Sequence, residues 1–192
     1  MSSMTVSRNS FFGSSVVPFR LVFIMWCVFS LELFYGIDLG WLGIKPRTLS
    51  GLLGIFTAPM IHGSLAHLIS NTVPLLFLGS VLFFFYESVA GIVFFRCYII
   101  TNILVWLFSP RVSYHIGASG LIYGLSSFLI VYGLLRRDFI SLLVSIGILL
   151  VYGGIFYGVL PTDPGISWES HLAGATVGII TAFNLKDINK VD

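Results

Sequence analysis

The chain has 192 residues, of which 57% are hydrophobic and only 9% are charged, and its mean hydropathy is +0.99. Because soluble domains usually carry about 25% charged residues, this composition indicates a membrane protein. A formal net charge of +2, without a run of basic residues, excludes a nucleic-acid-binding surface. A spanning helix needs about 20 apolar residues, so the chain has room for about six spans and no large domain outside the bilayer.

Apolar runs of helical length recur along the whole chain. The first covers residues 16–36 and carries Glu32 near its far end; it is too long for a signal-peptide core, so we predict a retained helix. The other predicted spans cover residues 65–85, 89–108, 119–135, 139–159 and 167–183. The alternation typical of a transmembrane β-barrel is absent. The sequence therefore predicts an all-α membrane protein, a bundle of six transmembrane helices forming one domain over residues 1–192.

Basic residues predict which ends of these helices face the cytoplasm. With a cytoplasmic N-terminus, the inner side receives Arg8, Arg20, Arg136, Arg137, Lys186 and Lys190. The outer side receives only Lys45, Arg47 and Arg111, while Arg96 lies within a span. Because cytoplasmic loops are enriched in Lys and Arg, we predict that both termini are cytoplasmic. The connections at 37–64, 109–118 and 160–166 then lie on the outer side.

The segment before the fourth predicted span, residues 109–118, is polar and contains glycine. Non-helical backbone at membrane depth is tolerated only where protein shields it or where it lines a water-filled cavity. We therefore expect an aqueous pocket open to the outer side. Cys27 and Cys97 both lie in apolar stretches, so we predict packing residues rather than a disulfide, a metal site or a redox site.

The entry to the second predicted span carries His62, His67 and Asn71. Residues four apart project from one face of a helix, so His67 and Asn71 lie side by side. Five residues turn a helix by roughly 500°, which places His62 about 140° away from His67. With no carboxylate or thiolate nearby, this group is not expected to bind a metal. Two interpretations stay open: donors that satisfy buried backbone carbonyls, or a pair of donors for an anion.

A second group, Gly117-Ala-Ser119-Gly120, opens the fourth predicted span. Where a buried helix begins, the backbone N–H of the serine is unsatisfied and lies at the positive end of the helix dipole. The flanking glycines, Gly117 and Gly120, leave room for a substrate backbone to approach. Taken alone, this group favours a helix N-cap role for Ser119 over a catalytic one. Tyr123 lies one turn further along the same face and is available to pack against whatever faces Ser119.

Stripes of small residues mark the fourth and sixth predicted spans. They consist of Gly120 and Gly124 on the fourth span and of Gly174 and Gly178 on the sixth. Such stripes permit close helix contact in lipid, which would bring His171 beside Ser119. An imidazole within hydrogen-bond reach of a hydroxyl is the minimum for an activated nucleophile, although a packing helix with a satisfied histidine would show the same stripe. Glu169 lies about 200° around the helix from His171, so we predict a dyad rather than a triad.

Combined, the three groups supply what acyl transfer requires. Ser119 and His171 would serve as nucleophile and general base, and the Ser119 backbone N–H, His67 and Asn71 would serve as donors to a tetrahedral oxyanion. Acyl transfer to water is hydrolysis, and this chemistry needs neither a cofactor nor a metal. The sequence therefore predicts a hydrolase whose site lies within the bilayer.

These residues resemble the rhomboid intramembrane serine proteases. His67 and Asn71 match the HxxxN element of the family, Gly117 to Gly120 match its GxSG element, and His171 with Gly174 and Gly178 match its HxxGxxxG element. The resemblance covers about residues 45–180, nearly the whole predicted membrane core. Two departures stand out: Lys45-Pro-Arg47 occupies the connection in which the family often has a Trp-Arg pair, and Ala58 replaces an upstream histidine of some members.

The resemblance implies a six-helix rhomboid-like core and cleavage of transmembrane protein substrates within the lipid bilayer. It implies Ser119 as nucleophile, His171 as base, His67 and Asn71 as oxyanion donors, Tyr123 stacked on His171, and a structural role for His62. It also implies a bacterial inner membrane location, with the site nearer the outer side. The alternative is a catalytically inactive rhomboid-like chaperone or transport module. Lipid-facing and helix-contact positions look alike, so the sequence makes no prediction of oligomeric state.

Overall fold

Helices make up the regular structure of this chain. The structure, a computed structural model, describes residues 10–162 and 165–188. Its longer helices are α2 (Val16–Tyr35), α4 (Leu65–Phe85), α5 (Glu87–Phe108), α6 (Ser119–Arg136), α7 (Phe139–Tyr152) and α8 (Trp168–Leu185). The shorter ones are α1 (Phe11–Ser14), α3 (Gly51–Thr57) and the 3-10 helices η1 (Gly40–Leu42), η2 (Ala58–Met60) and η3 (Gly153–Val159). The described ranges contain no β-strand, only an isolated bridge between Ile44 and His115.

Each predicted span coincides with a helix, with one correction. The span predicted over residues 139–159 is α-helical only to Tyr152 and continues as the 3-10 helix η3. Five helical segments in the described part of the chain are long and apolar enough to cross a membrane, namely α2, α4, α5, α6 and α7 together with η3. The helix predicted over residues 167–183 is confirmed as α8, but α8 is not one of these five, so its crossing of the membrane stays a prediction. Arg8 and Lys190, which entered the charge count, lie outside the described residues.

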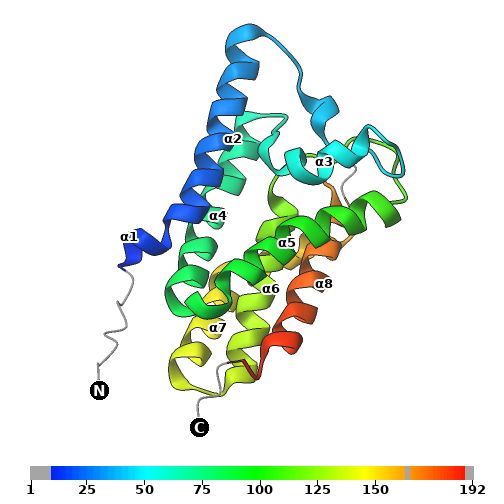
Figure 1. Cartoon of the computed structure of the whole chain (residues 1–192). Helices are drawn as coiled ribbons and strands as arrows, with labels where there is room; N and C mark the ends of the chain where they lie inside the picture. Colours follow the sequence, from blue (N-terminus) through cyan, green and yellow to red (C-terminus); the bar gives the residue numbers. More distant parts are fainter. Residues whose placement is uncertain (1–9, 163–164, 189–192) are drawn as a thin grey trace, which may run out of the picture.

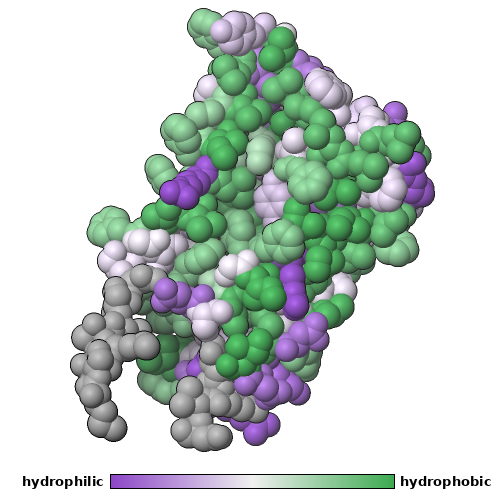
Figure 2. Space-filling view, viewed as in Figure 1, coloured by the Kyte–Doolittle hydropathy of each residue, from purple (hydrophilic) through white to green (hydrophobic). Residues whose placement is uncertain are grey.

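Helix α6 lies at the centre of the bundle and α7 lies at its edge. α6 packs against α4, α5, α7 and α8, and it is the most buried of the apolar helices. In Figure 1, α2 rises from α1 and α8 descends toward the C-terminal end of the chain, while α5 crosses the bundle at a steep tilt. Figure 2 shows a face that is largely hydrophobic, as expected for a surface that contacts lipid.

Local signals place the helix that carries His67. Ser64 has extended backbone and its side chain accepts from the backbone N–H of His67 at 3.1 Å, so it caps the start of α4. His67 therefore lies in the first turn, and Asn71 follows one turn below. Pro74 lies inside α4 and provides no backbone N–H to the helix. The end of α2 is set by Gly36, which adopts a left-handed conformation with φ 63°.

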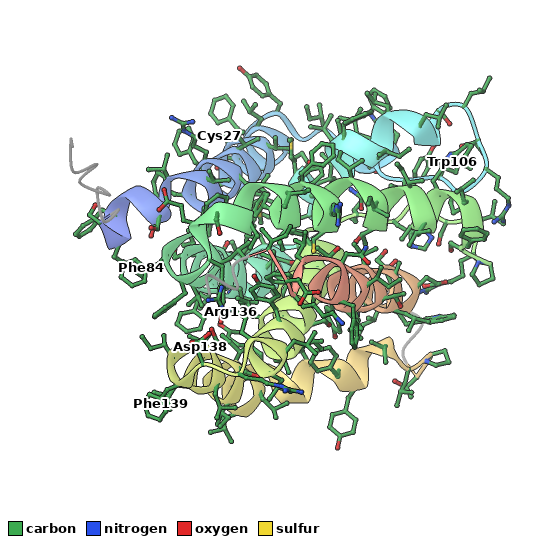
Figure 3. The ribbon with its side chains drawn as sticks, turned by 60° about the horizontal axis from the view of Figure 1, so that its bottom comes forward. Cys27, Phe84, Trp106, Arg136, Asp138 and Phe139 are labelled. Atoms are coloured by element: carbon green, nitrogen blue, oxygen red, sulfur yellow. The ribbon has the colours of Figure 1, made fainter. Side chains whose placement is uncertain are left out.

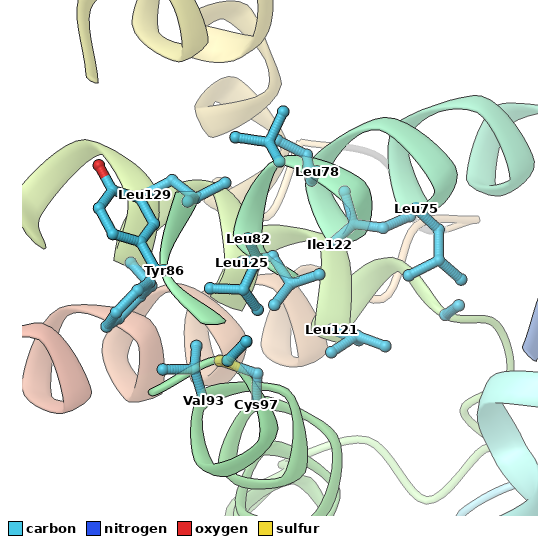
Figure 4. Close-up of a cluster of buried hydrophobic side chains, with 14 of the residues drawn as sticks. Leu75, Leu78, Leu82, Tyr86, Val93, Cys97, Leu121, Ile122, Leu125 and Leu129 are labelled. Atoms are coloured by element: carbon cyan, nitrogen blue, oxygen red, sulfur yellow. The ribbon is translucent and has the colours of Figure 1, made fainter. Parts of the chain in front are cut away.

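The hydrophobic core lies where α4, α5 and α6 meet. Figure 4 shows this cluster, which includes Leu75, Leu78, Leu82, Val93, Cys97, Leu121, Leu125 and Leu129. The expectation that both cysteines are packing residues is confirmed for Cys97, which is buried, and is wrong for Cys27, which is exposed on α2 (Figure 3). At the far end of α6, Arg136 forms an ion pair of 2.9 Å with Asp138, and Asp138 caps α7.

The predicted small-residue stripes form the contact between α6 and α8. A Cβ atom at Gly174 would lie 2.0 Å from the carbonyl oxygen of Gly120, and one at Gly178 would lie 2.1 Å from that of Gly124. Since the obstructing atoms belong to the backbone, neither position accepts a side chain without separating the helices. The glycines therefore set the distance between α6 and α8.

We predict that Gly178→Ala destabilises the protein by about 1–3 kcal/mol, because the added methyl group forces the two backbones apart. The matched control is Gly147→Ala on α7, where an added Cβ meets nothing within 4 Å. The melting temperature of each purified variant in detergent checks this prediction. Equal melting temperatures for the two variants would show that the α6–α8 contact tolerates a side chain.

Candidate active site

Ser119 and His171 meet at the adjoining starts of α6 and α8. Ser119 is the first residue of α6, and His171 lies in the first turn of α8. The Nε2 atom of His171 and the Oγ atom of Ser119 are 2.9 Å apart, which is hydrogen-bond distance. The meeting of these two side chains, predicted from the glycine stripes, is confirmed. This is the distance that a hydroxyl nucleophile and a general base would require.

The second nitrogen of His171 is held by the backbone. Nδ1 lies 2.9 Å from the carbonyl oxygen of Gly158 in η3. A carbonyl only accepts hydrogen bonds, so Nδ1 carries the proton in the neutral ring and donates it to Gly158. The lone pair of Nε2 then faces Ser119 and can accept its proton. Both ring nitrogens are engaged by these partners, and neither is engaged by a carboxylate, as a dyad requires.

Tyr123 stacks on the ring of His171. Its ring is nearly parallel to that of His171, at an angle of 8° with 4.1 Å between ring centres. Its hydroxyl donates to the carbonyl oxygen of Ile155, again in η3. The edge of Phe156 also packs against the Tyr123 ring, with the ring centres 5.9 Å apart. The packing of Tyr123 toward the residue that faces Ser119 is therefore confirmed, and η3 holds it there.

The loop that leads to Ser119 is shaped by glycine. Gly117 has φ 102°, which disfavours other residues, and a Cβ there would lie 2.6 Å from Nε2 of His67. The N-cap of α6 is Ala118, with no side-chain cap, so the alternative that Ser119 itself caps the helix is wrong. No side chain competes for the N–H groups at this helix start, which leaves them available to an anion.

His67 and Asn71 lie on the same side of α4 and face the same cavity as Ser119. The Asn71 side chain is buried, and its Nδ2 donates to the carbonyl oxygen of His67 at 2.8 Å. This bond fixes the orientation of the amide and leaves its second N–H to donate elsewhere. Asn71 is therefore compatible with both roles considered from the sequence. One amide hydrogen satisfies a backbone carbonyl, and the other is available to an anion.

His62 packs against His67 from outside the helix. The two rings meet edge to face with centres 4.9 Å apart, and His62 is only 2% exposed. Neither nitrogen of His62 has a hydrogen-bond partner of normal geometry among the described residues. Burial, aided by the nearby His67, lowers the pKa of His62 to about 4. His62 is therefore neutral at physiological pH and supports the position of the His67 ring.

A cavity of about 690 Å³ joins these groups. Its walls include Ser119, His171, His67, Asn71, Tyr123, Pro74, Ile122, Ile155, Arg111 and His115. Polar side chains and apolar ones thus line the same space, as is usual for sites that bind and orient a substrate. A pocket was expected beside the segment before the fourth predicted span, and the cavity lies there; that it holds water and opens to the outer side stays a prediction.

An ion pair joins the loop before α6 to the first turn of α8. Arg111 Nε donates to Oε1 of Glu169 at 2.6 Å, and another guanidinium nitrogen donates to Oε2 at 2.5 Å. The same guanidinium donates to the carbonyl oxygen of Ile166 at 2.5 Å. The pair is partly shielded, with side-chain exposures of 30% for Arg111 and 5% for Glu169. The loop that carries Ser119 is therefore fastened to the start of the helix that carries His171.

His115 makes a second connection between the same two segments. Its Nε2 lies 2.9 Å from the Ser109 hydroxyl, and its Nδ1 contacts the hydroxyl of Ser167. Its backbone exchanges two hydrogen bonds of 2.9 Å with Ile44, which attaches the connection between α2 and α4. Burial, together with the nearby Arg111, lowers the pKa of His115, although Glu169 opposes the shift. A neutral His115 thus links three separate segments.

Arg111, His115 and Glu169 were not predicted from the sequence as parts of the site, and neither were the backbone acceptors of η3. For the two charged residues the sequence does contain a signal. In a chain with 9% charged residues, Arg111 and Glu169 each lie within ten residues of Ser119 or His171. Glu169 faces away from His171 around the helix, and this same orientation directs it toward Arg111. No side-chain pattern identifies a carbonyl such as that of Gly158.

We predict that Glu169→Ala destabilises the protein by about 2 kcal/mol, because it leaves the Arg111 guanidinium without its bidentate acceptor. The double variant Arg111→Met, Glu169→Leu removes both charges and should be less destabilised than the single variant. Melting temperatures of the wild type, Arg111→Met, Glu169→Leu and the double variant form the required cycle. Additive losses would indicate that the pair is not coupled.

We also predict a loss of stability in acid that depends on His62. The unfolded chain takes up a proton on His62 below about pH 6.5, whereas the folded chain stays neutral there until about pH 4. Stability is therefore lost as the pH falls through this window, by about 3 kcal/mol for this residue. Melting temperatures between pH 7.5 and roughly pH 4 should fall less steeply for His62→Asn than for the wild type. Parallel profiles would contradict the assignment.

Comparison with known proteins assigns the chain to a family. Residues 50–187 match the family described as Rhomboid domain. An uncharacterized protein of Mycobacterium bovis and one of Mycobacterium tuberculosis are each 35% identical over 186 residues, covering 90% of this chain and 75% of each relative. An uncharacterized protein of Mycobacterium leprae is 36% identical over 162 residues, covering 74% of this chain and 60% of that protein. The chain therefore belongs to the rhomboid family.

Proposed function

We propose that this protein is an intramembrane serine endopeptidase, which hydrolyses peptide bonds in or near transmembrane segments of membrane protein substrates. The observation that carries the proposal is the 2.9 Å contact between Ser119 Oγ and His171 Nε2. A half-buried serine and a buried histidine that line one cavity, with the histidine lone pair directed at the hydroxyl, form the reactive part of a serine hydrolase.

The proposed reaction has two stages. As the Ser119 Oγ atom attacks the scissile carbonyl, His171 Nε2 takes the hydroxyl proton, and His171 then gives that proton to the departing amine. The acyl group remains bonded to Ser119. In the second stage, His171 takes a proton from water, the water oxygen attacks the acyl group, and Ser119 is released with its proton restored. No cofactor or metal takes part in either stage.

Three donors support stabilisation of the oxyanion. The backbone N–H of Ser119 lies at an uncapped helix start, and the second N–H of Asn71 is not used by the His67 carbonyl. The ring of His67 lies directly against Gly117, two residues before the nucleophile. Donors fixed before the reaction cost little reorganisation when the negative charge develops, so they contribute most in a shielded site.

We also propose the orientation of the chain in the membrane. The start of α2 and the end of α8 lie toward the same end of the bundle (Figure 1), as is required if both termini face the cytoplasm. The cavity lies near the opposite end, beside the starts of α4, α6 and α8. In a bacterial inner membrane, the site would then open toward the outer side, and transmembrane substrates would reach it through the lipid.

We predict that the purified wild type converts a model transmembrane substrate into two fragments, whereas Ser119→Ala yields none, because it removes the only proposed nucleophile. A fluorophosphonate probe should label the wild type and leave Ser119→Ala unlabelled. Thr176→Ala serves as a control, since Thr176 lies on the same helix as His171 and its hydroxyl bonds only the Leu172 carbonyl. A wild type that is neither labelled nor active would favour the inactive chaperone or transport module.

A further inference from the structure

The 3-10 helix η3 contacts both Tyr123 and His171, the two stacked rings that lie beside Ser119. Within η3, the carbonyl oxygen of Gly158 accepts from Nδ1 of His171, and the carbonyl oxygen of Ile155 accepts from the hydroxyl of Tyr123. The 3-10 helix thus presents two backbone acceptors, three residues apart, to two stacked rings. The segment contributes no titratable group to either contact.

The fit between η3 and the stacked rings leaves no space for a side chain at position 158. A Cβ atom there would lie 2.2 Å from the Tyr123 hydroxyl oxygen and 3.1 Å from Nδ1 of His171. The two neighbouring glycines of the segment behave differently. A Cβ at Gly154 would meet nothing within 4 Å, and one at Gly153 would meet only the Leu149 side chain, at 3.4 Å. The requirement for glycine is therefore specific to position 158.

The segment is carried by the least buried of the apolar helices. α7 buries only Ser141, Ser145 and Ile148, and it lies at the edge of the bundle (Figures 1 and 3). At its C-terminal end, the ring of Tyr152 stacks on Phe77 of α4 with ring centres 5.8 Å apart. Few buried contacts make a segment easier to displace than the core helices. The carbonyl oxygens that contact His171 and Tyr123 therefore belong to a segment at the edge of the bundle.

We propose that the carbonyl oxygen of Gly158 is a positioning group for His171, and that the contact of η3 with Tyr123 and His171 switches the base on. This inference rests on the proposed function and specifies how the same site is regulated. While η3 is in contact, Nδ1 keeps its proton and Nε2 accepts from Ser119. When η3 moves away, Nδ1 loses its acceptor and the ring is free to take the other tautomer, whose Nε2–H cannot accept a proton.

The same contact has a role in the transition state. When Nε2 accepts the proton of Ser119, the ring becomes a cation, and its Nδ1–H bond to Gly158 becomes charge-assisted. The peptide dipole of Gly158 thereby takes, in weaker form, the orienting role that a carboxylate performs in serine protease triads. Movement of α7 would remove this support, so hydrolysis should be coupled to the position of α7.

The test uses three variants with a steric rescue. Gly158→Ala should lower kcat by on the order of 10²-fold, with a smaller change in KM, because displacement of about 1 Å in a positioned group costs that much. Gly154→Ala, the same substitution where space is open, should keep wild-type activity. Tyr123→Phe removes the obstructing oxygen and leaves the nearest ring carbon at 3.4 Å from the added Cβ. The double variant Gly158→Ala, Tyr123→Phe should therefore be more active than Gly158→Ala alone.

The tautomer of His171 provides a readout that does not require catalysis. Ring 15N chemical shifts of histidine-labelled protein, assigned by comparison with His171→Asn, should show a protonated Nδ1 in the wild type and Gly154→Ala. Gly158→Ala should lose this signature, and the double variant should regain it. Activity and shifts in Gly158→Ala that match those of Gly154→Ala would overturn the inference and leave the protease proposal intact. The predicted shift pattern in a wild type that cleaves nothing would reject the protease and retain Gly158 as the group that orients His171.

Discussion

The close contact between α6 and α8 is the constraint on which the rest of the site depends. Glycine carbonyls on α6 take the space that side chains on α8 would need, and the two backbones touch as a result. Ser119 and His171 lie in the first turns of these helices. The distance between the helices therefore sets the distance between the Ser119 hydroxyl and the His171 imidazole. In lipid, burying apolar side chains between helices removes no surface from water, so there is no hydrophobic driving force for helix contact. A close contact between glycine-lined backbones depends on van der Waals packing instead and therefore suits this environment.

Two kinds of attachment hold the site from opposite directions. On one side, Arg111 and Glu169 join the loop before α6 to the first turn of α8, with charges that are rare elsewhere in the chain. On the side of α7, the attachment uses only backbone carbonyls and ring faces. The first attachment is bidentate and partly shielded, which favours a fixed geometry. The second belongs to a segment with little buried surface, which favours movement. The part of the site that holds Ser119 is therefore expected to be more rigid than the part that holds His171.

Much of the helical fold and the central pair of residues could be predicted from the sequence, because they follow from patterns of side chains. Long apolar runs located the helices, and the spacing of Gly120, Gly124, Gly174 and Gly178 predicted which two would touch. The 3-10 turn after Tyr152 was missed because an apolar run has the same composition in either helix type. The Gly158 acceptor was missed because every residue has a backbone carbonyl, so the sequence does not mark which one accepts from His171. The pairing of Arg111 with Glu169 joins residues 58 positions apart, and only the tertiary fold shows that their loops adjoin.

The unequal surroundings of the two cysteines have a practical consequence. Cys97 is sealed between α5 and α6, whereas Cys27 lies exposed on α2. Cys27 lies near the middle of α2, a helix long enough to span the bilayer, so its exposed side chain would face lipid rather than water. Because water-soluble thiol reagents act on accessible thiolates, a maleimide should leave both native cysteines unmodified in the folded chain. A single cysteine introduced on a connection outside the bilayer would then carry a fluorophore or nitroxide alone, with no need to engineer a cysteine-free background.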